Sequence, residues 1–204
     1  TLHTDCATSA TKDTANRTRP NITYGEVLPE SVSEDVIARL GITATDVFYD
    51  LGSGTGKIPL QVALETPVAA SKGVEYVAAR HNIGERVLKD LRGLAQVLSA
   101  LDRVQLIQGD CCTQDITDAT VIFINNTVFQ PDLMLRIVAL LASLPKLRTF
   151  ITLRKICSRH RESACGRKQS PCCQFYHPEG VSGSVRPTWD RETTLFVYKR
   201  KQLV

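Results

Sequence analysis

The stretch Val47-Phe48-Tyr49-Asp50-Leu51-Gly52-Ser53-Gly54-Thr55-Gly56-Lys57 decides the fold expected of this chain. Its apolar first half predicts a buried strand, and its glycines predict a tight turn into a helix over 58–64. Glycines at such a turn let the backbone approach a ligand, and the helix N-terminus offers free N–H groups. The stretch therefore predicts a binding site for a nucleotide-like cofactor.

The residues around this turn distinguish between kinds of cofactor. A phosphate-binding P-loop would have Gly in place of Leu51 and Ser or Thr in place of Ile58, and the dinucleotide fingerprint G-x-G-x-x-G differs from glycines at every second position. Asp50 would repel a pyrophosphate but suits an ammonium group, and Lys57 could pair with a carboxylate. S-adenosylmethionine carries both groups and is the expected cofactor. A turn whose glycines serve only steric needs is the alternative.

Strands and helices alternate along the rest of the chain. Apolar runs predict further strands at 72–75, 104–107, 121–124 and 150–153. Helical spacing is found at 77–101, where Val87, Leu91, Leu94 and Leu98 are expected on one side, and at 133–144. A last alternating run at 193–198 predicts an antiparallel or edge strand. This order predicts an α/β fold with a doubly wound, mostly parallel sheet.

Composition divides the chain into three parts. Residues 1–20 are polar without an apolar period, and they predict an N-terminal arm. Residues 21–41 predict a lead-in segment and a short helix over the cofactor site, with a capping box at Ser31-Val32-Ser33-Glu34 and an end at Gly41. The core is expected over 42–204, with a basic, Cys-rich insertion at about 157–186.

The overall composition indicates a globular protein. With 204 residues, of which 43% are hydrophobic, the chain can bury one sizeable core. No apolar run approaches the roughly 18 residues of a membrane-spanning helix, and the polar start has no signal-peptide centre, so we expect a soluble piece of a longer protein. Seven cysteines, with adjacent pairs at 111–112 and 172–173, favour a reducing compartment, cytosolic or nuclear.

Basic side chains, and cysteines and histidines of the kinds that can bind metals, are concentrated toward the C-terminal end. Residues 154–204 carry a net charge of +7 against −3 for residues 1–153, and the stretch 154–168 holds six Lys and Arg. An acidic partner could dock there, or the stretch is an ordinary solvated loop. The same region contains Cys157, His160, Cys165, Cys172, Cys173 and His177. Their irregular spacing lacks a C-x₂-C pair, so we expect no metal site.

Candidate ligand-binding residues follow three further strands. Glu75 lies where an acidic side chain accepts hydrogen bonds from ribose hydroxyls. Gly109-Asp110-Cys111 ends a strand where an acid can recognise an adenine amine, although a helix cap is the alternative. Asn125-Asn126-Thr127-Val128-Phe129 follows the next strand, where amides and a ring can orient an amine and flank a cation, or can simply form a turn.

Together these elements resemble the catalytic domain of the disruptor-of-telomeric-silencing family of non-SET histone lysine methyltransferases. The resemblance spans roughly residues 21–153 and rests on the order of its motifs. These are Tyr24-Gly25-Glu26, the glycine-rich stretch, Gly73-Val74-Glu75, Gly109-Asp110 and the run from Val121 to Phe129. The resemblance implies a Rossmann-like class I methyltransferase fold that uses S-adenosylmethionine and releases S-adenosylhomocysteine.

The resemblance also implies a role for individual residues. Asp50, Gly52 and Lys57 would hold the methionine end of the cofactor, Glu75 the ribose, and Asp110 with Cys111 the adenine, although the family often has Phe in place of Cys111. Tyr24, Asn125 and Phe129 would form the channel for the target lysine. Tyr24, Glu26, Gly54 and Asn125 would complete the cofactor-binding set.

The implied function is methylation of a lysine in the folded core of a nucleosomal histone, in the nucleus. The basic 154–168 stretch is then available to nucleosomal DNA, and no membrane is involved. One alternative is a methyltransferase of the same fold that acts on a nucleic-acid base amine. Such an enzyme would have an Asn/Asp-Pro-Pro-aromatic element after the fourth strand, and Asn125-Asn126-Thr127-Val128 contains no proline. Another is a chromatin module that binds the cofactor without activity.

Overall fold

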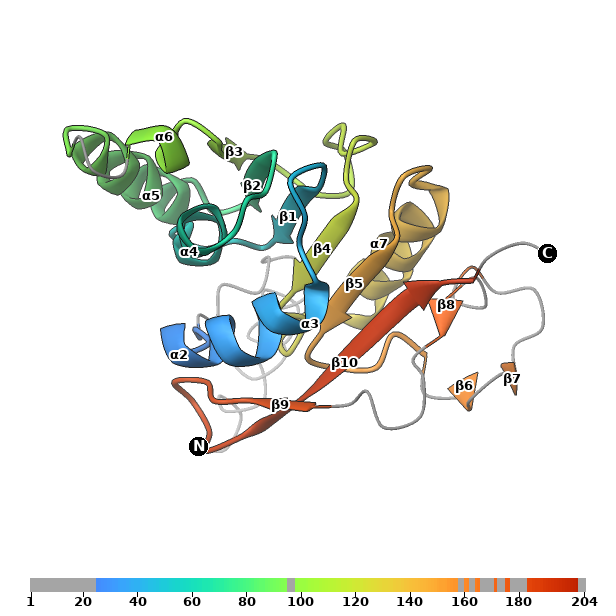
Figure 1. Ribbon diagram of the computed structural model, residues 1–204. Helices are drawn as coiled ribbons and strands as arrows, with labels where there is room; N and C mark the ends of the chain where they lie inside the picture. Colours follow the sequence, from blue (N-terminus) through green and yellow to red (C-terminus); the bar gives the residue numbers. More distant parts are fainter. Residues whose placement is uncertain are drawn as a thin grey trace, which may run out of the picture.

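A single mixed sheet organises the computed structural model of the chain (Figure 1), which describes residues 25–94, 98–157, 160–161, 164–165, 171, 175–176 and 183–201. Its strands lie in the order β3-β2-β1-β4-β5-β10-β8, and β9 pairs with β10. The parallel strands are β1 (Val47–Leu51), β2 (Ala70–Glu75), β3 (Val104–Gln108), β4 (Val121–Ile124) and β5 (Thr149–Thr152). The doubly wound, mostly parallel α/β fold expected from the sequence is confirmed.

The first strand of the sheet lies at its centre. Strand β1 pairs in parallel with β2 on one side and with β4 on the other, so that Asp50 lies between Gly73 and Phe123. The chain order reverses direction at this point of the sheet. Ligands of open parallel sheets bind outside the carboxyl ends of the strands at such a reversal.

The last strand closes the sheet in the antiparallel sense. Strand β10 (Thr193–Arg200) pairs with β5, and on its other side with β8 (Phe175–Tyr176) and β9 (Gly183–Val185). The predicted antiparallel strand is confirmed, but it does not lie at an edge. A separate short pair is formed by β6 (His160–Arg161) and β7 (Ala164–Cys165) within the expected insertion.

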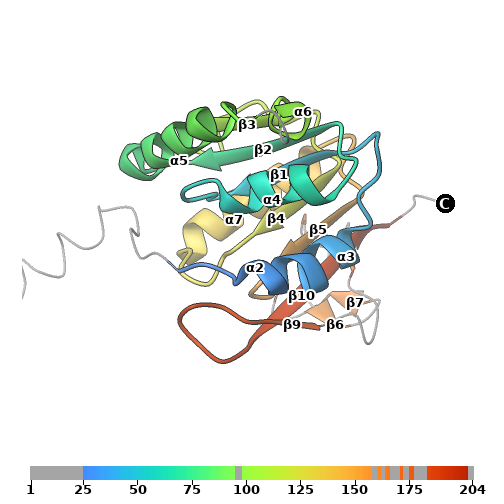
Figure 2. The same cartoon turned by 60° about the vertical axis from the view of Figure 1, so that its left-hand side comes forward.

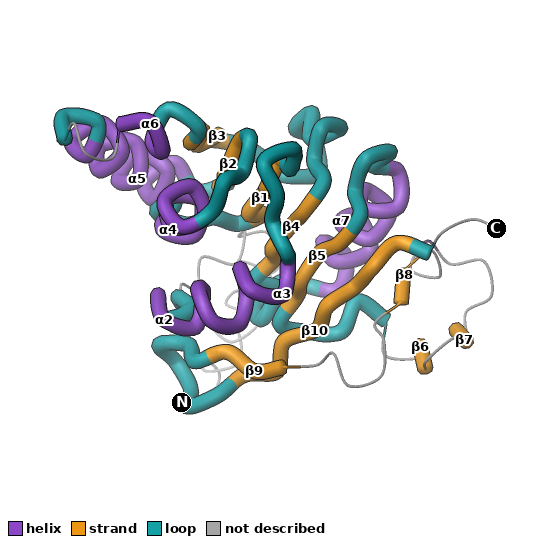
Figure 3. The backbone as a smooth tube through the Cα atoms, in the orientation of Figure 1, coloured by secondary structure: helices purple, strands orange, loops and turns teal. Residues whose placement is uncertain are grey.

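Helices cover both faces of the sheet (Figure 2). Helix α4 (Lys57–Glu65) and the N-terminal helix share one apolar core with the sheet, whereas α7 (Pro131–Ser143) packs on the opposite face through Ile137 and Leu141. Helices α5 (Ala78–Leu91) and α6 (Leu98–Leu101) lie near β3 and β2 (Figure 3). None of the helices in the described part of the chain is long and apolar enough to cross a membrane.

The N-terminal helix begins earlier than the sequence predicted. It comprises α2 (Pro29–Ser31), the π-helical turn η1 (Val32–Ile37) and α3 (Ala38–Leu40). Proline favours the first turn because it lacks an N–H and its φ is preset, so Ser31 falls inside the helix and its hydroxyl bonds Asp35. The predicted capping box is therefore wrong. The predicted end at Gly41 is confirmed, with φ of 55°.

The helix predicted over 77–101 is interrupted, and the apolar side predicted for it is not its buried face. Helix α5 ends at Leu91, and Val87 and Leu94 are 42% and 51% exposed. The buried residues of α5 are Gly84 and Leu88. A Cβ at Gly84 would lie 2.7 Å from the carbonyl oxygen of Thr55. This close approach turns the glycine face of the helix, rather than the Val87 face, toward the sheet.

Candidate cofactor site

A cavity of about 470 Å³ lies at the carboxyl ends of the central strands. It brings together every site residue predicted from the sequence that the structure describes: Glu26, Asp50, Gly52, Gly54, Lys57, Glu75, Asp110, Cys111, Asn125 and Phe129. The remaining one, Tyr24, lies outside the described residues. The cavity thus occupies the point of chain reversal between β1 and β4.

Asp50 is one of two buried acidic residues that line this cavity, the other being Glu75. Asp50 lies in β1 and is 3% exposed. Burial, reinforced by the negative charge of Glu75, raises the pKa of Asp50 to about 8. Within the described part of the chain, no donor is found for its carboxylate. A buried carboxyl group facing a cavity in this way suits a ligand that brings its own cationic or donor group.

Glu75 connects the glycine turn to the start of α5. One of its carboxylate oxygens accepts the N–H of Gly54 at 2.8 Å, and the other accepts the N–H of Val77 at 2.7 Å. Each oxygen keeps a second lone pair. Glu75 therefore fixes the shape of the turn, a role that the sequence did not reveal, and it retains acceptor capacity for the ribose hydroxyls expected from the sequence.

The glycine turn approaches the β4 loop across the cavity. Gly52 has a φ of 91°, and a Cβ at this residue would lie 3.1 Å from Cζ of Phe129. Left-handed backbone of this kind is readily adopted only by glycine. Any larger residue at this position would be strained and would also narrow the space between the turn and Phe129.

An ion pair between Lys57 and Glu26 lines the cavity. Nζ of Lys57 lies 2.6 Å from Oε2 of Glu26. The lysine side chain is two-thirds exposed, so this pair contributes little to folding stability. The sequence predicted both residues as cofactor ligands, and the structure places them against each other at the cavity. A cofactor carboxylate would have to share Lys57 with Glu26.

The segment that carries Glu26 is held by a distant part of the chain. Val27 bridges Pro187, and the N–H of Thr188 donates to the carbonyl of Glu26 at 2.8 Å. Trp189 packs over Gly25, where a Cβ would lie 2.3 Å from the indole ring. The connection between β9 and β10 thus positions the lead-in segment over the cavity.

The two asparagines after β4 have different surroundings. Asn125 lines the cavity, its Nδ2 donates to the carbonyl of Gly25 at 3.3 Å, and its Oδ1 accepts the Thr127 hydroxyl at 2.8 Å. Asn126 is buried, and its Oδ1 accepts the N–H groups of Leu153 and Arg154 at 3.0 and 2.8 Å. The sequence pattern alone did not distinguish the roles of the two amides. The structure makes Asn126 a connection between β4 and β5.

Replacing Asn126 with Ala is expected to destabilise the chain by about 2–6 kcal/mol, because it leaves two donors without their acceptor and each such buried group costs about 1–3 kcal/mol. Denaturant unfolding measures this change. Asn125→Ala, at a partly exposed position, is the matched control and should cost less than about 1 kcal/mol. Equal losses in the two variants would contradict the distinction between the two residues.

Both carboxylate oxygens of Asp110 accept hydrogen bonds. Its Oδ1 accepts the N–H of Cys112 at 2.9 Å, and its Oδ2 accepts Nη2 of Arg136 at 2.8 Å. Burial opposes ionisation, but these two bonds outweigh it and hold the pKa of Asp110 below its usual value. Arg136, on α7, was missed from the sequence because no local pattern pairs it with Asp110. Other cavity residues missed in the same way are Tyr76, Arg80, Gln130 and Leu133.

The described part of the chain includes a few residues of the insertion. Of the side chains weighed as zinc ligands, only that of Cys157 is described. In the basic stretch, Arg154 and Lys155 line a second cavity of about 430 Å³, which shares Val128, Phe129 and Gln130 with the first. The side chains of Arg159, Arg161, Arg167 and Lys168 lie outside the described residues.

Sheet order, antiparallel last strand and cavity position define a Rossmann-like class I methyltransferase fold. Two solved structures share this fold with the chain. A variant of MtNAS in complex with S-adenosylmethionine superposes with a TM-score of 0.57 at 13% identity, covering 85% of this chain and 62% of the other. An RNA methyltransferase from Salinibacter ruber in complex with S-adenosyl-L-homocysteine superposes with a TM-score of 0.50 at 20% identity. The match covers 84% of this chain and 94% of the other.

Residues 7–177 match the family described as histone methylation protein DOT1, and the chain belongs to this family. Relatives named "Histone-lysine N-methyltransferase, H3 lysine-79 specific" include one from Caenorhabditis elegans, 35% identical over 56% of this chain and 13% of its own length. The relative from Candida albicans is 32% identical over 67% of this chain and 11% of its own. The matched region is thus a small part of these longer proteins.

Proposed function

We propose that this chain binds S-adenosylmethionine in the cavity at the ends of β1, β2 and β4 and transfers its methyl group to a histone lysine. The observation that carries the proposal is the buried carboxyl group of Asp50, which faces the cavity beside the glycine turn in a chain of the DOT1 family. An ammonium group is a suitable partner for this carboxylate because the opposite charge favours its ionised form.

The residues along the cavity match successive parts of the cofactor. Asp50 would pair with the ammonium group, and Lys57 would pair with the carboxylate. Glu75 would accept the ribose hydroxyls through its remaining lone pairs. Asp110 and Cys111, at the end of β3, would border the adenine ring. When bound, the cofactor supplies a methyl group already activated by the adjacent sulfonium charge.

The chain's own contribution to the reaction is to align and desolvate the amine. Phe129 approaches Gly52 in the cavity that Asn125 also lines, and Asn125 would accept a hydrogen bond from the lysine amine. Tyr24 is proposed to complete this channel. A lysine amine must lose its proton before it can attack, and an apolar channel that excludes water lowers its pKa.

The proposed acceptor is a lysine in the folded core of nucleosomal histone H3, following the names of the relatives. Arg154 and Lys155, in the second cavity, lie next to the proposed channel. Together with the rest of the 154–168 stretch, they would contact nucleosomal DNA or an acidic histone surface. This substrate implies that the protein acts in the nucleus.

Two other functions remain alternatives because the fold is common to methyltransferases of many substrates. A base-amine methyltransferase would modify nucleic acid without histones. A non-catalytic module would bind the cofactor without transfer to any acceptor. Methyl transfer measured in parallel on nucleosomes, free histones and naked DNA separates these functions.

Calorimetry with S-adenosylhomocysteine tests the role of Asp50. Because its carboxyl is mostly protonated below pH 8, pairing with an ammonium group should release about one proton, and affinity should rise up to about tenfold per pH unit between pH 6 and 7. Asp50→Asn should bind more weakly and lose this pH dependence. The same pH slope in the variant and the wild-type chain would contradict the assignment.

The same substitution is expected to stabilise the unliganded chain. In the unfolded chain Asp50 ionises near the ordinary aspartate pKa of 3.8, whereas in the folded chain it stays protonated up to about pH 8. The stability of the wild-type chain should therefore fall as the pH rises between these values, and Asp50→Asn should escape this loss. A higher melting temperature for the variant at pH 7.5, combined with weaker binding, is the expected result.

A further inference from the structure

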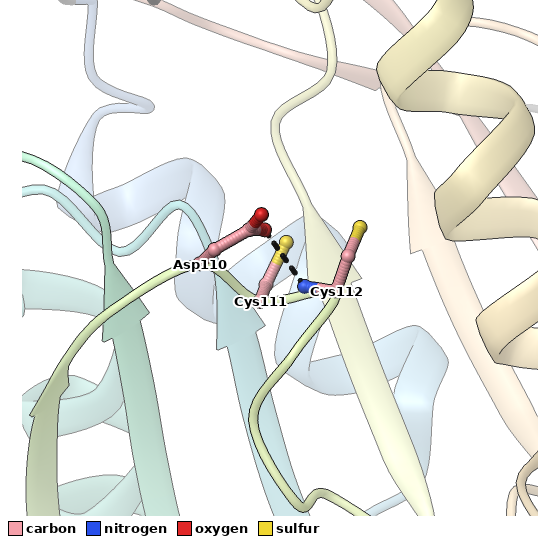
Figure 4. A group of neighbouring side chains, drawn as sticks. All are labelled: Asp110, Cys111 and Cys112. Atoms are coloured by element: carbon pink, nitrogen blue, oxygen red, sulfur yellow. Dashed lines mark hydrogen bonds between the residues drawn. The ribbon is translucent and has the colours of Figure 1, made fainter.

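Two adjacent thiols lie at the edge of the proposed cofactor cavity. Cys111 and Cys112 belong to the turn after β3, in which the N–H of Cys112 donates to Oδ1 of Asp110 at 2.9 Å (Figure 4). A hydrogen bond from the N–H of Thr113 to the carbonyl of Asp110 at 2.9 Å closes this turn. Both cysteines are free, and Cys111 lines the cavity. Their sulfur atoms and a carboxylate oxygen of Asp110 all lie within 4.8 Å of one another.

The surroundings of this cluster favour thiol chemistry over metal binding. Both oxygens of Asp110 already accept hydrogen bonds, one from Arg136 and one from the backbone of Cys112. The guanidinium group beside the cluster would also repel a cation. The two sulfurs are therefore left chiefly with each other as reaction partners.

The two thiols differ in acidity. A hydrogen bond from the Cys111 thiol lowers the pKa of Cys112, and the positive charge of Arg136 acts in the same direction against the effect of burial. The same interaction and burial raise the pKa of Cys111. Cys112 is thus the sulfur that ionises first, and a thiolate is the form that reacts with peroxides.

We propose that Cys111 and Cys112 form a reversible oxidation site, at which hydrogen peroxide produces a disulfide that weakens cofactor binding. The second half of this inference rests on the proposed function, because it takes the cavity as the cofactor site. The first half depends only on the two cysteines and their turn.

The chemistry proceeds in two balanced steps. The Cys112 thiolate attacks one oxygen of the peroxide, the O–O bond breaks, and the hydroxide that leaves takes up a proton to form water. The Cys111 thiol then loses its proton, and its sulfur displaces hydroxide from the Cys112 sulfenic acid, which departs as a second water. Two thiols lose two electrons, and one peroxide becomes two waters.

The disulfide would reshape the turn. Adjacent Cα atoms lie about 3.8 Å apart, whereas disulfides usually join Cα atoms about 4.4–6.8 Å apart. The backbone between Asp110 and Thr113 must therefore change, which moves both Asp110 and the cavity wall at Cys111. A strained disulfide is also readily reduced by a dithiol, so the modification is reversible.

Mass spectrometry of the full chain tests the first half of the proposal, the formation of a disulfide between Cys111 and Cys112. Trypsin cleavage after Arg103 and Arg136 releases residues 104–136, which contain Cys111 and Cys112 and no other cysteine. After peroxide treatment and alkylation, this peptide should lack both alkyl groups and weigh two hydrogens less than the reduced form. Dithiothreitol should reverse the change. Because Met134 lies in the same peptide and can gain one oxygen as its sulfoxide, fragment ions must locate any added oxygen. Oxidation that stops at one oxygen on a cysteine, or a link to another peptide, would overturn the proposal.

Calorimetry with S-adenosylhomocysteine tests the second half of the proposal, the weaker binding of the cofactor after oxidation. The oxidised chain should bind at least about tenfold more weakly than the reduced chain, and bound ligand should reciprocally slow oxidation. Cys112→Ser, with Cys112→Ala in reserve if it does not fold, should bind as the reduced chain does before and after peroxide. Equal affinities of the oxidised and reduced wild-type chain would overturn the link to binding. If the reduced chain binds no ligand, the proposed function fails, while the peptide mass still decides whether the site exists.

Discussion

Replacing Gly52 with Arg is expected to weaken binding of S-adenosylhomocysteine by at least about 100-fold, or about 2.7 kcal/mol. The φ of 91° strains any non-glycine residue, and the new side chain would start 3.1 Å from Phe129. The arginine must therefore either fill the cavity or displace the ring. Both outcomes remove the space between the glycine turn and the β4 loop. Calorimetry measures the loss directly.

Gly41→Arg is the matched control for this experiment. Gly41 also has a positive φ, of 55°, but nothing lies within 4 Å of a Cβ at that position. The control adds the same charge at another glycine of positive φ, at the end of the N-terminal helix and away from the cavity. Its affinity should stay within a few-fold of the wild-type chain. A comparable loss in both variants would show that backbone strain, and not the cavity, governs binding.

Replacing Asn125 with Ala is expected to lower the methyl-transfer rate by roughly 100-fold, because a displacement of the reacting group by about 1 Å can cost that much. Cofactor affinity should change by only a few-fold, since the main cofactor contacts are assigned to Asp50, Glu75 and Asp110. Single-turnover transfer and calorimetry give the two quantities separately.

Gln130→Ala controls for changes at the same cavity, because Gln130 lines it from the same loop but is exposed. Its transfer rate should stay within a few-fold of the wild-type rate. If Asn125→Ala lost affinity and rate to the same extent, Asn125 would be a structural residue that holds Gly25 and Thr127 rather than one that orients the amine.

The sequence predicted the sheet well because its strands are short apolar runs, each followed by the residues that line the cavity. The carboxyl ends of parallel strands meet at one edge, so residues as distant as Asp50 and Asn125 could be placed together from topology alone. The glycine turn was equally predictable, since its spacing is local and its positive φ values require glycine.

Features that depend on contacts between distant segments were not predictable in this way. The buried face of α5 is set by the approach of Gly84 to Thr55, which no helical period reveals. The pairing of Arg136 with Asp110, and the bonds that Asn126 accepts from the residues after β5, join residues 26 to 28 positions apart. Each of these depends on how helices and loops pack on the sheet.

Transfer of a labelled methyl group from S-adenosylmethionine to intact nucleosomes, free histones and naked DNA tests the central claim most directly. Parallel reactions with the Asn125→Ala chain show whether any signal depends on the proposed channel. We predict transfer to nucleosomes, with the label on a lysine of the H3 folded core and a loss of roughly 100-fold in the variant. Label on naked DNA, or tight cofactor binding without transfer to any of the three acceptors, would contradict the account.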